Sequence, residues 1–174
     1  MSLVYFWLVF VLVVLGDQLF KFLVRSNGWF WTLNEGVAFS IGQDWWWMEW
    51  VVWGTVAALL LLYIKYQILN IKNTNKKLSI NKNQEKGRNL EENILATENM
   101  KLDTLAYGLI VGGAVSNLID RVLWGGVVDY IRIDPFGWGL PVFNVGDVGI
   151  CTGMGIWLLK GVKEVLTVIS HPSS

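Results

Sequence analysis

The chain has 174 residues, of which 53% are hydrophobic and 16% are charged, and its mean hydropathy is +0.44. This composition argues against an ordinary soluble domain. The formal net charge is zero, so the total charge gives no information about partners. We expect no nucleic-acid partner. Four apolar runs approach the roughly 20 residues that cross a bilayer, and they cover about residues 3–24, 45–69, 105–123 and 148–169. The sequence therefore predicts a single all-α membrane domain, a four-transmembrane-helix bundle.

The first run ends in an acid–base pair. Asp17 and Lys21 stand four residues apart, which places them on one helix face with the acid first, the favourable order for an ion pair. Paired buried charges are more often structural than reactive, so we expect this pair to support a pocket. Only Met1 and Ser2 precede the run, without the basic stretch that opens a signal peptide. We therefore interpret residues 3–24 as a retained span.

The segment after the first run is predicted to form a small β-element. Large apolar residues alternate with polar or smaller ones over 29–33, as in a short strand. Residues 34–36 favour a turn, and residues 36–42 could return as a second strand. We expect a small extracytoplasmic β-hairpin or sheet whose tryptophans lie at headgroup level. Asn34 is singled out because its amide could bind the backbone of a substrate.

The stretch between the second and third runs is polar and basic. Most of the lysines and arginines lie between the end of the second run and the start of the third, over Lys65–Asp103, namely Lys65, Lys72, Lys76, Lys77, Lys82, Lys86, Arg88 and Lys101. Because basic loops remain on the cytoplasmic side of a membrane, we expect this stretch and both termini to be cytoplasmic. Residues 70–100 are predicted to be a polar loop insertion that is disordered or weakly helical, although residues 90–100 could form a short surface helix.

Small residues predict close packing of the later runs. Gly108 and Gly112 in the third run form a small-xxx-small pair, which lets two helices approach closely. Cys151, in the fourth run, is the single cysteine and cannot form an internal disulfide. We interpret it as a small core residue.

The third run then gathers polar residues on one face. Gly113, Asn117 and Arg121 follow one another at i, i+4 and i+8, and Asp120 lies beside this face. The amide of Asn117 can donate and accept hydrogen bonds, and Arg121 is a permanent forked donor. Interfacial charge alone would account for Asp120 and Arg121, but less well for Asn117, which lies about one turn deeper. We therefore expect this face to line a site.

Two aspartates follow outside the third run. Asp129 stands in the β-like residues 127–133, and Asp147 opens the fourth run three residues after Asn144, an arrangement typical of a helix N-cap. Ionisable groups at the ends of membrane segments usually face a protein interior or a watery cavity. Two such carboxylates can share one proton and activate a water molecule. Because a helix N-terminus stabilises negative charge, we expect Asp147 to stay ionised and Asp129 to hold the proton.

Other chemistries find less support in the sequence. His171, the only histidine, lies in the C-terminal tail, so no Ser–His or Cys–His pair is indicated. Zinc-ligand spacings are also absent, and we expect neither a metal nor a cofactor. Two alternatives remain open. One is a cation transporter or channel subunit whose path is lined by Asp120, Asp129 and Asp147, and the other is a membrane scaffold without activity.

Five short motifs occur in order along the chain: D-Q-x-x-K at 17–21, N-x-G-x-A-F-S at 34–40, G-G-x-x-x-N-L-I-D-R at 112–121, V-V-D at 127–129 and F-N-x-x-D at 143–147. Each is weak alone, but together they extend across all four runs. The set resembles the lipoprotein signal peptidase family, also called signal peptidase II. The sequence departs from that family at Gly146, where alanine is usual, and in its long polar loop.

The resemblance implies an aspartic peptidase of the bacterial plasma membrane. Such enzymes cleave the signal peptide from prolipoproteins just before the diacylglyceryl-modified cysteine, and globomycin inhibits them. By motif, Asp129 and Asp147 match the catalytic dyad, while Asn117 and Arg121 match substrate contacts, to which we add Asn34. The supporting pocket would comprise Asp17, Lys21, Gly113, Asp120 and Asn144. We expect a monomer surrounded by membrane lipids, with an outward-facing site that takes lipid-modified prolipoprotein or a globomycin-type inhibitor.

Overall fold

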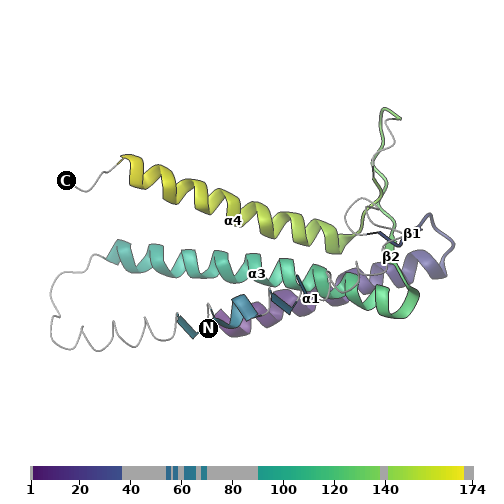
Figure 1. The fold of residues 1–174 in the computed structure, drawn as a ribbon, viewed down its shortest axis with the longest axis horizontal. Coiled ribbons are helices and arrows are strands. Elements are labelled where there is room, and N and C mark those ends of the chain that lie inside the picture. The colour runs from purple at the N-terminus through teal and green to yellow at the C-terminus, as the bar shows by residue number, and fades with distance from the viewer. Residues whose placement is uncertain are drawn as a thin grey trace.

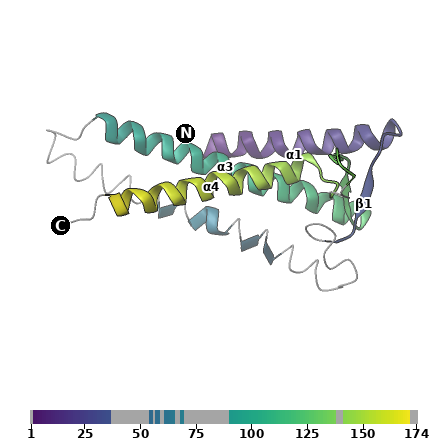
Figure 2. The same cartoon turned by 90° about the horizontal axis from the view of Figure 1, so that it is seen from above.

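The structure, a computed structural model, describes residues 2–36, 54–55, 57–58, 61–65, 68–69, 90–137 and 141–170. The elements in chain order are α1 (Ser2–Ser26), β1 (Thr32–Asn34), α3 (Leu90–Trp124), β2 (Val127–Asp129) and α4 (Val145–Ser170). The three helices run along the long axis of the molecule with α3 between α1 and α4, and the two strands lie at one end (Figure 1 and Figure 2). We call this the strand end of the bundle.

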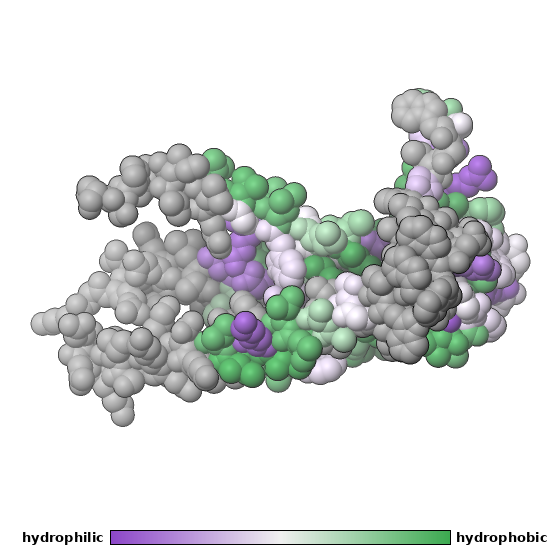
Figure 3. Space-filling view, in the orientation of Figure 1, coloured by the Kyte–Doolittle hydropathy of each residue, from purple (hydrophilic) through white to green (hydrophobic). Residues whose placement is uncertain are grey.

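The helices are inverted in polarity relative to those of a water-soluble protein. Three stretches, Leu3–Ser26, Glu98–Trp124 and Val145–Lys163, are long and apolar enough to cross a membrane. Leucines such as Leu15 and Leu159 are 63% and 72% exposed, and hydrophobic residues cover much of the outer surface (Figure 3). Charged and polar side chains are instead buried between the helices. This arrangement is that of a membrane protein, because exposed apolar side chains face lipid at no cost.

Glycines bring α3 against its two neighbours. A Cβ atom on Gly108 would lie 2.8 Å from Val9 Cγ1, and one on Gly112 would lie 3.0 Å from Val13 Cβ. The predicted close packing at these two glycines is therefore confirmed, and the partner is α1. On the other side of α3, a Cβ on Gly113 would collide with the carbonyl oxygen of Gly146 at the start of α4. Side chains larger than hydrogen at these positions would force the helices apart.

The second predicted span lies mostly outside the described residues. Residues 54–55, 57–58, 61–65 and 68–69 of the expected 45–69 span are helical. Tyr63 in this stretch is buried and stacks on Phe6 of α1, with ring centroids 4.1 Å apart. The described residues therefore contain three candidate spans together with helical portions of the second predicted one.

One helix boundary and the burial of one residue differ from the sequence-based prediction. Helix α3 begins at Leu90, so residues 90–100, expected to be disordered or a short surface helix leading into the third span, are continuous with the spanning helix. Extending an existing helix avoids the unfavourable nucleation step, which explains why these polar residues are helical. Cys151, interpreted as a core residue, is exposed on α4, among side chains that face outward from the bundle.

The strand after α1 pairs with a distant segment. Thr32–Asn34 pairs antiparallel with Val127–Asp129, so that Thr32 lies opposite Asp129 and Asn34 opposite Val127. The predicted strand at the end of α1 and the predicted β-structure around Asp129 are thus present, as two strands of one sheet. The return strand expected at 36–42 lies outside the described residues, apart from Gly36. The pairing carries the segment after α1 across to the region of the two predicted catalytic aspartates.

Candidate active site

The two aspartates reach the same place from different elements. Asp129 is the last residue of β2 and Asp147 lies in the first turn of α4. Between them the chain makes an excursion that is closed by an antiparallel bridge from Ile131 to Phe143, with Ile131 N donating to Phe143 O at 2.8 Å. This closure sets Asn144, which follows the bridge, next to Asp129. The site therefore depends on one short backbone bridge that returns the chain to β2.

Asn144 links both aspartates. Its side-chain Nδ2 donates to Asp129 Oδ1 at 2.7 Å, and its backbone N donates to Asp147 Oδ2 at 3.2 Å. In return, Asp147 N donates to Asn144 Oδ1 at 2.9 Å. The predicted helix cap is thus confirmed, in the reciprocal form that satisfies two otherwise unpaired N–H groups. The helix cap and the junction between the two carboxylates are one structure.

Asp129 is buried, with 2% of its surface exposed, and its second oxygen is held by β1. Asn34 Nδ2 donates to Asp129 Oδ2 at 3.1 Å, and Asn34 Oδ1 accepts from Gly36 N at 3.1 Å. Burial raises the pKa of Asp129 to about 6, the hydrogen bond from Asn34 opposes this rise, and the negative charge of Asp147 adds to it. The pKa of Asp129 therefore lies closer to neutrality than that of an ordinary aspartate.

Asp147 is held from α3 through Asn117. Asn117 Nδ2 donates to Asp147 Oδ1 at 2.8 Å, and Asn117 Oδ1 accepts from Lys21 Nζ at 2.9 Å. Because a lysine ammonium can only donate, it fixes which end of the Asn117 amide faces Asp147. Both ends of this amide are engaged within the protein. In this structure Asn117 thus contacts a predicted catalytic carboxylate directly.

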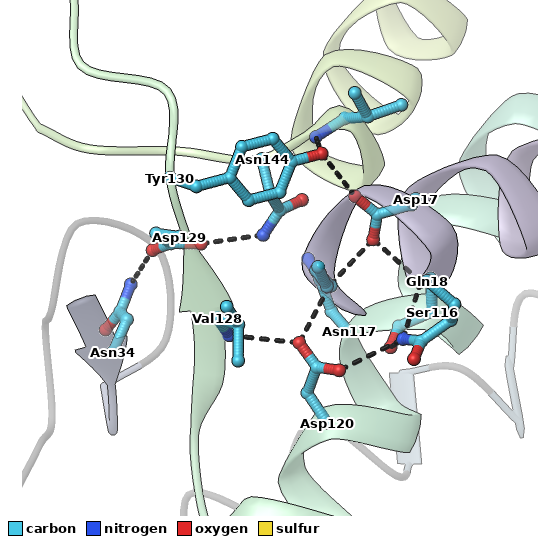
Figure 4. A network of polar contacts seen from close by, with 12 residues as sticks. Asp17, Gln18, Asn34, Ser116, Asn117, Asp120, Val128, Asp129, Tyr130 and Asn144 are labelled. Atoms are coloured by element: carbon cyan, nitrogen blue, oxygen red, sulfur yellow. Dashed lines mark hydrogen bonds and ion pairs between the residues drawn. The ribbon is translucent and has the colours of Figure 1, made fainter. Parts of the chain in front are cut away.

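A buried charge cluster of Asp17, Lys21 and Asp120 adjoins the two aspartates, and Figure 4 labels Asp17 and Asp120 with their hydrogen bonds. Lys21 Nζ is 2.7 Å from Asp17 Oδ2 and 2.9 Å from Asp120 Oδ2, and all three side chains have 0% exposure. The predicted Asp17–Lys21 ion pair is present, and Asp120 joins it from α3. Asp120 Oδ2 also accepts from Val128 N at 3.0 Å, which ties the cluster to β2. Lys21 thus uses its three donors on Asp17, Asp120 and Asn117.

Two further polar residues complete this cluster, Gln18 of the D-Q-x-x-K motif and Ser116, neither of which was predicted to belong to the site. Gln18 Nε2 donates to Ser116 Oγ and to Asp120 Oδ1, each at 3.0 Å, and Ser116 Oγ donates to Asp17 Oδ2 at 2.7 Å. Among the described residues, no buried side-chain nitrogen or oxygen lacks a hydrogen-bond partner. A small hydroxyl one position before Asn117, in an otherwise apolar run, is the sequence signal that could have identified Ser116.

Arg121 and Gly113 lie on either side of this centre. The Arg121 guanidinium donates to the carbonyl oxygens of Glu35 and Gly36, the residues that follow β1. Gly113 lies against the Gly146 carbonyl, where a side chain would displace the first turn of α4. Arg121 therefore borders the segment after β1, and Gly113 allows Asp147 to approach α3.

Within the described ranges, no group of three or more histidine, cysteine, aspartate or glutamate side chains could hold a metal ion. The arrangement instead combines two carboxylates, each with its oxygens held by N–H donors, above a buried lysine. Carboxylates placed in this way can exchange protons with a bound water and with a substrate carbonyl.

Known proteins are similar to this chain in sequence and in fold. A family model described as "Signal peptidase (SPase) II" matches residues 92–163. A lipoprotein signal peptidase of Brucella ovis is 32% identical over 165 residues, covering 87% of this chain and 86% of that protein. One of Polynucleobacter necessarius is 28% identical over 172 residues, covering 90% and 88%. A bacterial membrane enzyme solved by the in meso method has the same fold, with a TM-score of 0.63 at 22% identity, over 97% of this chain and 93% of that one. The chain therefore belongs to the signal peptidase II family of bacterial membrane proteases.

Proposed function

We propose that this protein is an aspartic endopeptidase that removes signal peptides from diacylglyceryl-modified prolipoproteins, cutting before the lipidated cysteine. Asp129 and Asp147 would be its catalytic dyad. The observation that carries the proposal is the joint attachment of both carboxylates to Asn144, by its side-chain and its backbone nitrogen. The names of the relatives support the class of substrate.

The proposed chemistry assigns one proton to the pair. Asp147 accepts hydrogen bonds from Asn117 Nδ2 and Asn144 N. It lies at the start of α4, where the helix dipole favours negative charge. It acts as the ionised base that removes a proton from water as the water oxygen attacks the scissile carbonyl carbon. Asp129, whose pKa is raised by burial, donates its proton to the carbonyl oxygen. The C–N bond then breaks as the leaving amine takes up the proton that Asp147 had received. The former carbonyl oxygen returns its proton to Asp129, which restores the singly protonated pair.

The neighbouring polar residues divide between holding the dyad and meeting the substrate. Asn34 and Asn117 each bind one dyad carboxylate, so we assign them to orienting the carboxylates and, once substrate is present, to contacting its backbone. Arg121 bonds the backbone that follows β1, and we propose that it binds the substrate chain there. The buried cluster of Asp17, Lys21 and Asp120 supports this arrangement from below.

The proposed setting is the bacterial plasma membrane, with both termini cytoplasmic and the active site on the extracytoplasmic side. This orientation rests on the concentration of lysines between the second and third apolar runs. Consistent with it, α1 begins and α4 ends away from the strand end, where the dyad lies (Figure 1). The protein would act as a monomer among lipids.

The direct test is cleavage by the purified protein in detergent micelles. We expect cleavage of a diacylglyceryl-modified prolipoprotein, no cleavage of the same precursor without lipid, and loss of cleavage when globomycin is added. Mass spectrometry of the products would locate the cut before the modified cysteine. A protein that leaves the lipidated precursor intact would contradict the proposal, and ion flux in proteoliposomes would favour a channel or transporter instead.

The pH dependence of cleavage tests the assignment of the proton. Asp129 must be protonated in the proposed mechanism, and its pKa is raised to about 6. Since a carboxyl group releases its proton above its pKa, the active form declines as pH rises. We expect kcat/KM to fall through about pH 6 and to approach a tenfold loss per pH unit at higher pH. A kcat/KM that stays constant from about pH 5 to about pH 8 would contradict this assignment.

A further inference from the structure

The hydroxyl of Tyr130 connects the three parts of the protein that meet at the dyad. Tyr130 directly follows Asp129, and its hydroxyl donates to Asp17 Oδ1 on α1 at 3.3 Å. The same oxygen accepts from the backbone N of Val145, the first residue of α4, at 3.4 Å. Figure 4 shows the phenol ring beside Asn144, with its oxygen directed at Asp17. One hydroxyl thus joins the end of β2 to α1 and to α4.

The hydroxyl provides a hydrogen-bond acceptor for the N–H of Val145 and a donor for the carboxylate of Asp17. The first N–H groups of a helix have no partner within the helix. At the start of α4, Asn144 accepts from Asp147 N and Val148 N, and the Tyr130 hydroxyl accepts from Val145 N. Oδ2 of Asp17 pairs with the Lys21 ammonium and accepts a hydrogen bond from the Ser116 hydroxyl. The Tyr130 hydroxyl donates to the other carboxylate oxygen, Oδ1. The hydroxyl thus extends the buried cluster to the helix that carries Asp147.

The direction of the hydroxyl is fixed by the ring. The Tyr130 ring stacks on Phe20 of α1, with centroids 6.3 Å apart and an interplanar angle of 15°. Burial raises the pKa of Tyr130, and the negative charge of Asp17 raises it further, so the phenol keeps its proton and remains a donor at every working pH.

We infer that Tyr130 is a positioning residue for the reaction, whose hydroxyl holds the start of α4, and with it Asp147, at a fixed separation from Asp129. The inference rests on the proposed function of these two aspartates. Both hydrogen bonds are long, so their loss should leave the fold intact. The effect should appear in the chemical step, since small displacements of catalytic groups are costly to rate.

Tyr130→Phe tests this inference because it removes only the hydroxyl and keeps the ring against Phe20. We expect kcat per folded molecule to fall about five- to tenfold, with KM within about twofold of the wild type. Folded protein would be quantified by near-UV circular dichroism, so that a smaller folded fraction is not mistaken for slower chemistry. Tyr5→Phe is the matched control, because Tyr5 is 48% exposed near the start of α1, and it should retain wild-type kcat.

The shape of the pH profile separates positioning from a general loss of stability. Among the described residues, the charged groups near the dyad include Asp17, Lys21 and Arg25 on α1, Asp120 and Arg121 on α3, Glu35 after β1, and Arg132 and Asp134 between β2 and α4. Tyr130→Phe changes none of these groups. Because carboxylates that are less firmly held together repel each other less, the acid and alkaline limbs of the kcat profile should move toward each other. A purely structural role would scale the profile without changing its shape.

Several outcomes would overturn the inference. These are a wild-type kcat, a raised KM at unchanged kcat, a profile reduced in height but unchanged in shape, or a Tyr130→Phe protein that does not fold. Asp129→Asn, assayed in parallel, tests the proposed function separately. If Asp129→Asn remains active, the dyad itself is wrong. If it is inactive while Tyr130→Phe behaves as the wild type, only the role of Tyr130 is wrong.

Discussion

Asparagine at either Asp129 or Asp147 is expected to lower kcat for prolipoprotein cleavage by about a thousandfold or more. The physical reason is that an amide can neither accept a proton from water nor donate one as an acid. Asparagine has nearly the volume of aspartate, so packing around the site should be preserved. In each variant, however, the new NH2 group faces an N–H donor. In Asp129→Asn, for example, that donor is Asn144 Nδ2. A loss of about 1–3 kcal/mol in the free energy of unfolding is therefore expected.

The measurement is single-turnover cleavage by each variant at matched amounts of folded protein. Glu35→Gln is the control, because it makes the same charge change on an exposed side chain adjacent to Asn34. It should cleave at the wild-type rate. Turnover near that of the wild type in either aspartate variant would show that the carboxylates do not form the dyad. Inactivity of both variants with Glu35→Gln active would agree with it.

Local spacing was enough to predict several parts of this site. The four-residue separation of Asp17 and Lys21 predicted an ion pair, and the structure contains it. The three-residue separation of Asn144 and Asp147 predicted the helix cap, which is also present. Both features depend on helix geometry alone, and this is why a sequence without structural data identifies them.

Contacts between distant segments could not be predicted in the same way. Neither the pairing of Thr32–Asn34 with Val127–Asp129 nor the contact of Asp120 with Lys21 follows from local periodicity. Strand register depends on which faces are buried in the folded protein, and the strand after α1 is too short to specify its partner. The motifs placed Asn34, Asn117 and Asp120 in one site, but only the structure shows that Asn34 contacts Asp129, Asn117 contacts Asp147 and Asp120 contacts Lys21.

The extent of α3 was also beyond local reasoning. Residues 90–100 are rich in polar residues, and composition favoured a disordered loop or a short surface helix leading into the third span. The helix continues through them because it is already nucleated by the apolar residues that follow. Asp103, which lies further along this helix, bonds Lys160 of α4 at 2.6 Å. This contact between α3 and α4 on the far side of the bundle was not visible from either sequence segment alone.

Replacing Lys21 with methionine is expected to lower the free energy of unfolding by about 3–5 kcal/mol. Methionine fills a similar volume but leaves the carboxylates of Asp17 and Asp120 buried together without a cation. It also removes the donor that fixes the Asn117 amide, so cleavage should be lost together with stability.

Unfolding by sodium dodecyl sulfate in mixed micelles would measure these differences. Lys101→Met, on the exposed side of α3, should change the unfolding free energy by no more than about 0.5 kcal/mol. If unpaired charge is the cause, adding Asp17→Asn and Asp120→Asn to Lys21→Met should restore much of the stability, since the buried negative charges are then gone. Cleavage should nevertheless stay low, because no ammonium group orients Asn117 toward Asp147. A triple variant as unstable as Lys21→Met alone would show that lysine stabilises the bundle by packing, and that the charges of Asp17 and Asp120 are not what it balances.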